Sequence, residues 1–317
     1  MAANKGVTDE EVILALKRFG SPKQAAQYLG MSERSVYYRR DSIQKNTGAE
    51  LPSFNAPQHT AVAKTMIPDN RRVIQHNIGD GVILVGSDAH YWPGEASVAH
   101  KAFVAAAKML KPDAIVLNGD VLDGARISRH EPLYNTNPPS VKQEIEACQE
   151  RLGEIEKASK NSTLFWTYGN HDVRLWRYIR INAPELEGLP SMDLFDHFPG
   201  WHHGWRVDIN DSVVIKHRYA SGVHAAYNNT MKSGRTLVTG HLHRLCVTPW
   251  GDYNGRRWGV DTGTLADPSG DQFTYMEENP TSGCSGFAVL TFKDGKLLPP
   301  ELCEVLDGVA YFRGKEL

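Results

Sequence analysis

Seven residues with metal-binding side chains each follow a short apolar segment of the chain. They are Asp88, His90, Asp120, Asn170, His217, His241 and His243. Imidazole, carboxylate and amide oxygen suit divalent cations such as Mn²⁺, Fe²⁺ or Zn²⁺, whereas a closed structural zinc site would favour thiolates. One Asp, such as Asp120, can bridge two ions with its two oxygens. These residue types therefore predict a pair of divalent cations.

The apolar segments in front of these residues are predicted to be buried strands. They cover residues 81–86, 114–117, 163–167, 213–215 and 236–239. Apolar stripes predict helices between them, one through Val98 and Leu110 and one from Val141 to Ile155. This alternation predicts an α/β domain, in which loops beyond the carboxyl ends of the strands converge on one crevice. The chain closes with an expected hairpin, in which a strand from Gly286, the turn 293–296 and a further strand follow one another.

The metal-binding residues stand in five short motifs. These are Asp88-Ala89-His90, Gly119-Asp120-Val121-Leu122-Asp123, Gly169-Asn170-His171-Asp172, His217, and Gly240-His241-Leu242-His243. In order and in position after strands, they resemble the calcineurin-like metallophosphoesterases over about residues 81–310. The resemblance implies two β-sheets packed face to face between helical layers, with the metals at the strand ends on one edge.

The resemblance also implies how two metals share the ligands. One metal would be held by Asp88, His90, Asp120 and His243, and the other by Asp120, Asn170, His217 and His241. Mn²⁺ is the expected ion, with Fe²⁺, Zn²⁺ or Ni²⁺ as alternatives. A hydroxide bridging the two ions would then attack phosphorus in line.

The fourth motif departs from the family, because His217 is followed by Arg218 where the family usually has glycine. Either Arg218 points away from the site or it contacts a substrate phosphate. Competing candidates for this ligand are His202, His203 and His224. His217 is preferred because the strand 213–215 leads straight into it.

By the same resemblance, His171 is not a ligand; it protonates the leaving oxygen or stabilises the transition state. Asp123 is expected to orient its imidazole, because a histidine that acts as an acid needs its other nitrogen fixed. Arg174 is a candidate phosphate clamp. Further candidates for substrate contact lie on the loop 124–139, namely Arg126, Arg129 and His130.

The first 47 residues predict three short helices. Thr8 and Glu11 form a capping box for a helix to about Phe19, Ser21 and Pro22 begin a second helix that Gly30 ends, and Ser32 caps a third through Arg40. The segment 21–40 is similar to a homeodomain-like helix-turn-helix, except that Arg39 stands where an apolar residue is more usual. Its expected DNA contacts are Arg34, Arg39 and Arg40. The alternative is a dimerisation or packing module, which would make the protein a homo-oligomer.

We therefore predict a small all-α helix-turn-helix domain over 1–47, a linker over 48–80 and a phosphoesterase domain over 81–317. Prolines at 52, 57 and 68 break any helix in the linker. The residues 71–76 are a candidate edge strand at the start of the second part.

Composition excludes several classes of protein. The formal net charge of −2 gives no whole-molecule attraction to nucleic acid or membrane, so charge-guided binding needs a local patch. The four cysteines form no CxxC pair, and no stretch resembles a signal peptide or a membrane span. We expect a cytoplasmic protein with no membrane partner, in the host cytoplasm if a phage encodes it.

The family acts on phosphomonoesters, phosphodiesters, cyclic nucleotides and nucleic acids. Gly124 stands where protein serine/threonine phosphatases place an arginine, and the GNHD motif resembles the nuclease subunits of DNA-repair complexes. Together with the N-terminal helices, this favours a phosphodiesterase or nuclease on DNA, a pairing that resembles phage-encoded enzymes. Two alternatives stay open: an enzyme on a small phosphoester with the helical module used for assembly, and a DNA-binding regulator that has kept a metal site.

Overall fold

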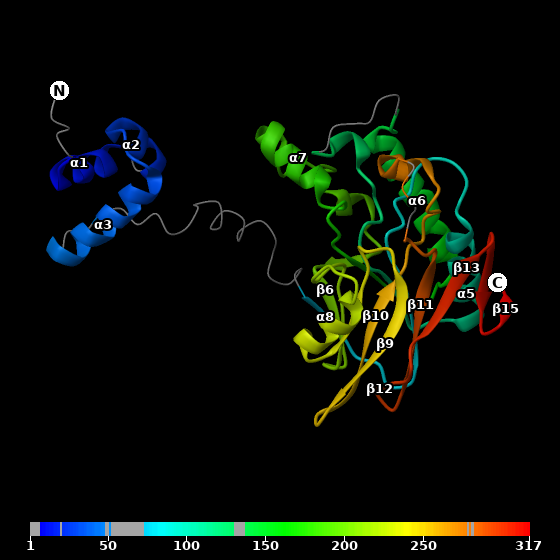
Figure 1. Ribbon diagram of the computed structural model, residues 1–317. Coiled ribbons are helices and arrows are strands. Elements are labelled where there is room, and N and C mark those ends of the chain that lie inside the picture. Colours follow the sequence, from blue (N-terminus) through cyan, green and yellow to red (C-terminus); the bar gives the residue numbers. More distant parts are fainter. Residues whose placement is uncertain are drawn as a thin grey trace. The chain divides into compact units, whose positions relative to one another are not determined.

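The computed structural model of the protein describes residues 7–19, 21–47, 51, 73–129, 137–277, 279 and 282–317. The chain divides into two compact units, residues 1–68 and residues 69–317. Figure 1 shows the helices of the first unit in blue and the sheets of the second unit in the later colours.

The first unit holds the helices α1 (Asp9–Phe19), α2 (Pro22–Leu29) and α3 (Glu33–Thr47). The starts of α1 and α2 were both expected from capping signals. Ser21 accepts a hydrogen bond from the Gln24 amide at 3.5 Å, and Gly30 ends α2 in the left-handed conformation, at a φ of 63°. The three helices share a small core of buried side chains from each: Val12, Leu16, Ala26, Val36 and Ile43.

The third helix was expected to end at Arg40, but it continues to Thr47. Ile43 lies seven residues after Val36, on the same face of the helix, and both side chains are buried in the small core. Packing of Ile43 therefore extends the helix through a polar segment whose sequence gives little sign of it.

The second unit contains two β-sheets. A six-stranded sheet has the order β1-β6-β7-β8-β10-β9, and a nine-stranded sheet has the order β15-β14-β13-β11-β2-β3-β4-β5 with β12 paired to β11. The strands of the first sheet are β1 (Val73–His76), β6 (Arg206–Ile209), β7 (Val213–Ile215), β8 (Thr236–Thr239), β9 (Leu245–Asp252) and β10 (Gly255–Thr262). Those of the second are β2 (Gly81–Gly86), β3 (Ala114–Leu117), β4 (Thr163–Thr167), β5 (His202–Gly204), β11 (Gly286–Lys293), β12 (Lys296–Leu297), β13 (Glu301–Leu306), β14 (Val309–Phe312) and β15 (Lys315–Glu316).

Alternation of side chains along the strands builds two cores. In β2, Ile83 and Val85 join the core between the sheets, where they meet strands β6, β7, β8 and β10. Leu84 points to the other face, where α5 (Val98–Leu110) and α6 (Val141–Ala158) cover the nine-stranded sheet. Helix α8 (Ala225–Ser233) packs on β8, β9 and β10. The expected α/β class, with two packed sheets flanked by helices, is confirmed.

Short helices complete the second unit. They are α7 (Arg174–Asn182) and the 3-10 turns Ala125–Ile127, Pro184–Leu186, Leu194–His197 and Asp271–Met276. The expected terminal hairpin is present, since β11 pairs antiparallel with β12 around a turn in which Asp294 and Gly295 both have positive φ. Among the described residues, no helix combines the length and the apolar character that crossing a bilayer requires.

The linker expected over 48–80 is too long at its C-terminal end. Strand β1 lies inside that range and pairs in parallel with β6, at the edge of the six-stranded sheet. Apart from Leu51, residues 48–72 lie outside the described residues, so the rest of the linker stays a prediction. The edge strand proposed for 71–76 is present from Val73 onward, because Ile74 packs against the core between the sheets.

Candidate metal centre

The seven candidate ligands follow the carboxyl ends of five strands, and both sheets contribute. Strands β2, β3 and β4 of the nine-stranded sheet lead to Asp88 and His90, to Asp120 and to Asn170. Strands β7 and β8 of the six-stranded sheet lead to His217 and to His241 and His243. The centre therefore lies where the two sheets present their carboxyl ends to each other.

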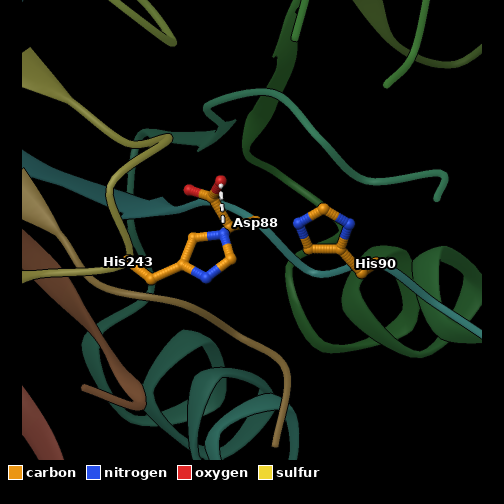
Figure 2. Close-up of side chains that lie close together, drawn as sticks. All are labelled: Asp88, His90 and His243. Atoms are coloured by element: carbon orange, nitrogen blue, oxygen red, sulfur yellow. Dashed lines mark ion pairs between the residues drawn. The ribbon is translucent and has the colours of Figure 1, made fainter. Parts of the chain in front are cut away.

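One group of potential ligand atoms comes from Asp88, His90 and His243, and these atoms lie within 4.8 Å of one another. Figure 2 shows the His243 ring beside the Asp88 carboxylate, with the His90 ring also close by. Nε2 of His243 is 3.2 Å from Oδ1 of Asp88. Both Asp88 and His90 are buried, so their polar atoms need partners inside the protein.

A second group comes from Asp120, His217 and His241, again within 4.8 Å of one another. Nε2 of His217 is 3.0 Å from Oδ2 of Asp120 and 4.0 Å from Oδ1 of Asp88. The two groups are thus neighbours, as two ions that share Asp120 require.

The backbone at the ligands is unusual. Five of them have φ between 42° and 71°, a region that costs a non-glycine residue about 1 kcal/mol or more: Asp88, His90, Asp120, His241 and His243. Close contacts with the candidate ligands also explain why two positions of the motifs are glycine. A Cβ at Gly119 would lie 2.5 Å from the His217 ring, and one at Gly169 would lie 2.2 Å from the Asp120 amide nitrogen. These positions exclude any larger residue without movement of a ligand.

Hydrogen bonds orient two of the histidine rings. Nδ1 of His90 is 3.1 Å from Oδ1 of Asp123, and Nδ1 of His217 is 2.7 Å from the Asn118 carbonyl oxygen. In each ring Nδ1–H donates this bond, which leaves the lone pair of Nε2 for a cation.

Two buried atoms at the centre have no hydrogen-bond partner among the described residues, Nε2 of His90 and Oδ1 of Asn170, and the buried Nε2 of His217 has only the Asp120 carboxylate beside it. Leaving a buried polar atom unsatisfied costs about 1–3 kcal/mol, so such a cluster is rare without a function. All three are lone-pair donors of the kind that divalent cations prefer. The residues present therefore fit two bound cations.

The buried ionisable side chains of the centre shift one another's pKa values. Burial alone would lower the pKa of His217, but the Asp120 and Asp88 carboxylates raise it to about 10. Burial would raise the pKa of Asp88, yet His217 and His243 hold it below its usual range. Without a cation, a proton on His217 compensates the two buried carboxylates.

His171 lies beside the ligands with its ring held on both sides. Nδ1 is 2.9 Å from Oδ1 of Asp123, and the Arg174 guanidinium nitrogen Nη2 is 3.0 Å from Nε2. Nε2 of His171 is 3.9 Å from Oδ2 of Asp120, so the ring faces the metal centre. Burial would lower the pKa of His171, but Asp120 and Asp123 raise it. Although His90, Asp123 and His171 also come within 4.8 Å, their mutual hydrogen bonds account for that proximity.

Sequence reasoning assigned no role to Asp172. Its buried carboxylate accepts hydrogen bonds from the amides of Asp120, Val121 and Gly169 at 2.8–3.0 Å, and from Leu122 N and Trp166 Nε1 at 3.1–3.2 Å. It thereby fixes the loop that carries Asp120. The signal in the sequence was the last residue of the GNHD motif.

The other residues predicted to contact substrate, and the alternative ligands to His217, lie outside the group of candidate ligands. Arg218 is exposed and lines a pocket of about 360 Å³ together with His241. Arg126 bonds the Pro138 carbonyl oxygen and Oδ1 of Asn137, and so closes its own loop. His130 lies outside the described residues. Of the competing histidines, His203 bonds the Tyr168 hydroxyl, while His202 and His224 are exposed.

Two of the three arginines expected to contact DNA are engaged within the first unit. Arg39 forms an ion pair with Asp9 of α1 and bonds the Val7 carbonyl oxygen. The Arg40 side chain is only 9% exposed and pairs with Asp41 at 2.7 Å. Arg40 and Ile43 share the buried face of α3, which residue type alone did not reveal. Arg39 and Arg40 are therefore poorly placed for DNA, whereas Arg34 is exposed.

Comparison with known proteins gives a family match. The family described as calcineurin-like phosphoesterase matches residues 81–245. The chain is 27% identical over 217 residues to the Gene 54 protein of Mycobacterium phage L5, covering 62% of this chain and 84% of that protein. The Gene 54 protein of Mycobacterium phage D29 is 26% identical over 224 residues, with the same coverage.

Solved structures of similar proteins include Yfce, a phosphoesterase from E. coli, at 16% identity and a TM-score of 0.34, covering 69% of this chain and 97% of that one. A dimetal phosphatase from Danio rerio shows 11% identity and a TM-score of 0.37, covering 76% of this chain and 98% of that one.

Proposed function

The chain belongs to the calcineurin-like phosphoesterase family, and on that premise we propose that it is a two-metal phosphodiesterase or nuclease that acts on DNA. The observation that supports metal-dependent hydrolysis is the cluster of buried lone-pair donors at His90, Asn170 and His217, of which those of His90 and Asn170 have no partner among the described residues. When bound, the cations supply Lewis-acid activation and stabilise negative charge that develops on the phosphoryl oxygens. Mn²⁺ suits a ligand set of imidazole, carboxylate and amide oxygen.

The chain's own residues hold the two ions as follows. Asp88, His90, Asp120 and His243 would hold one ion, and Asp120, Asn170, His217 and His241 would hold the other. Asn118 and Asp123 fix the tautomers of His217 and His90 through Nδ1.

His171 is proposed to give a proton to the leaving oxygen. The Asp123 carboxylate accepts the Nδ1–H bond, so the proton that His171 gives is one carried on Nε2. Because the Arg174 guanidinium donates to Nε2 in this structure, His171 takes up that proton only when Arg174 moves away. Arg174 bonds both His171 and the Asp123 carbonyl oxygen, at 3.0 and 2.8 Å. In this structure Arg174 therefore restrains the His171 ring. It can contact a substrate phosphate only after its hydrogen bond to His171 breaks.

A substrate with several phosphates is favoured by uncompensated positive charge near the centre. Arg218 shares a pocket with His241, and neither Arg218 nor Arg177 of α7 has an ion-pair partner within the described parts of the chain. The pKa of Arg177 is lowered by burial and by the nearby charges of Arg218 and Arg129. A phosphate next to the one being hydrolysed would compensate the repulsion between these arginines. A polynucleotide carries such a phosphate at every nucleotide.

The proposal is tested with full-length protein after verified metal removal and reloading with Mn²⁺. We expect hydrolysis of bis(4-nitrophenyl) phosphate and of single- or double-stranded DNA with Mn²⁺, and none in excess chelator. Arg218→Ala should lower kcat/KM on DNA and reduce its salt dependence, while leaving the small diester unaffected. Arg256→Ala, an exposed arginine on the β9–β10 hairpin, is the matched control. Hydrolysis of only a phosphomonoester, or full activity in chelator, would refute the proposal.

One observation supports a second candidate, an enzyme on a small phosphoester whose N-terminal unit mediates assembly. Because Arg39 and Arg40 are engaged, α3 presents less free positive charge than its sequence suggests. Deleting residues 1–47 separates the two candidates, since the second unit has its own cores. DNA binding by the N-terminal unit predicts weaker affinity and a smaller salt slope after the deletion. Assembly predicts a change of mass in solution with DNA affinity unchanged.

A further inference from the structure

A second pocket lies on the opposite face of the six-stranded sheet from the core between the sheets. It has a volume of about 400 Å³ and is lined by the start of α8 and by residues of β9 and β10, among them Cys246, Thr248 and Asp261. A cavity of this size accommodates a nucleoside. None of the catalytic roles described above uses it.

Asp261 is the distinctive residue of this pocket. Its side chain is 1% exposed, and Oδ1 has no hydrogen-bond partner among the residues described. Val260 faces the core between the sheets, so the next residue along the strand, Asp261, faces the pocket. An unsatisfied carboxylate oxygen costs free energy unless a donor reaches it. Burial, with a contribution from Asp88, accordingly raises the pKa of Asp261 to about 8, so the carboxyl ionises near neutral pH only when donors reach it, and binding of such donors releases its proton.

Opposite Asp261 lies the start of α8. No side chain caps this helix. The Ala225 amide donates to the Gly222 carbonyl oxygen at 3.2 Å, so the first-turn amides that need another acceptor are those of Ala226 and Tyr227. Ala226 and Tyr227 of this turn line the pocket. The pocket therefore offers amide donors on one side and a carboxylate acceptor on the other.

We propose that this pocket binds a guanine base of the substrate. The guanine edge presents one acceptor, O6, beside two donors, the N1–H and the N2 amino group. O6 accepts from the α8 amides, while N1–H and N2–H donate to Asp261. Adenine has a donor where O6 stands and no N–H at N1, so it leaves both sides of the pocket unsatisfied. The inference rests on the proposed function and adds a base preference to it.

The pocket is close enough to the metal centre for one nucleotide to span both. Asp261 pairs with Thr239 of the neighbouring strand, and Thr239 is two residues before the ligand His241. Paired strands lie about 5 Å apart, so Asp261 stands one strand away from the residue that leads into His241. Arg244, directly after the ligand His243, also lines the pocket.

Binding of nucleosides to the full chain tests the proposal, because nucleosides carry no phosphoester and are not hydrolysed. In isothermal titration calorimetry, deoxyguanosine should bind at least about tenfold more tightly than deoxyinosine, which lacks the N2 amino group, and more tightly still than deoxyadenosine. Asp261→Asn should remove the preference for guanine. Asp211→Asn, an exposed aspartate at the β6–β7 turn, is the matched control and should keep it.

Thr248→Leu provides a second variant, which narrows the pocket and leaves Asp261 in place. It should weaken binding of deoxyguanosine while the protein stays folded, as judged by circular dichroism. Equal binding of the three nucleosides, or guanine preference that survives Asp261→Asn, would overturn the inference.

A parallel assay separates this inference from the proposed function. Hydrolysis of bis(4-nitrophenyl) phosphate needs the metal centre but no base. If the diester is hydrolysed and the nucleosides bind alike, only the guanine pocket is refuted. If deoxyguanosine binds selectively but no phosphodiester is hydrolysed, the pocket stands and the proposed function fails.

Discussion

Oδ1 of Asp123 lies 2.9 Å from Nδ1 of His171, and the same oxygen lies 3.1 Å from Nδ1 of the candidate metal ligand His90. One carboxylate thus orients both the candidate acid and a ligand. The other oxygen, Oδ2, accepts a bond from the Trp92 indole at 3.2 Å, which fixes the rotation of the carboxylate. This arrangement predicts that proton transfer and metal binding depend on each other.

Replacing Asp123 should therefore affect two properties together. We expect Asp123→Asn to lower both Mn²⁺ affinity and turnover by about 10–100-fold, because a neutral amide polarises the two imidazoles less strongly. Metal content by mass spectrometry and kcat at saturating Mn²⁺ measure the two effects. If only turnover falls, the bond to His90 has no influence on the metal.

His171→Gln should separate acid catalysis from metal binding. We expect both metals to stay bound and turnover to drop by about 10²–10⁴, the range for loss of a general acid. His202→Gln, at an exposed histidine of β5, is the control. Loss of one metal equivalent in the His171 variant would show that His171 is a ligand.

Asp172 is expected to act on stability through the loop that carries Asp120. Asp172→Ala leaves several buried amides and the Trp166 indole without an acceptor, which should cost on the order of 3–5 kcal/mol of unfolding free energy. Urea denaturation of the metal-free protein gives the value. A loss below about 1 kcal/mol would mean that water replaces the carboxylate.

Glu144 predicts a pH dependence of stability. Burial raises its pKa from the ordinary value of 4.5 to about 7. The folded chain therefore binds more protons than the unfolded one, and the contribution of Glu144 is full below about pH 4.5 and is lost as pH rises through 7.

Glu144→Gln, which carries no charge at any pH, should reduce the fall in unfolding free energy between pH 5 and pH 8. Denaturant unfolding at four pH values across that range measures the slope. Glu146→Gln, on the exposed face of the same helix, should leave the slope unchanged. Equal slopes in the two variants would contradict the assignment.

The sequence by itself predicted the strands and placed the candidate ligands directly after them. Each of the strands β2, β3, β4, β7 and β8 is a short apolar run with a motif directly after it, so local pattern and chain order were enough. The C-terminal end of α3 and the strand β1 were harder to predict from the sequence. Ile43 and Ile74 pack there against side chains that are far away along the chain.

Only the tertiary structure decided which polar side chains have partners. Arg39 meets Asp9 thirty positions away, Asp172 collects amides from the loop after β3, and Asp261 faces α8 without a partner for Oδ1. Residue type specifies what a side chain can donate or accept. The environment that satisfies it is built by segments far apart in the sequence, and burial then sets the free-energy cost of any bond left unmade.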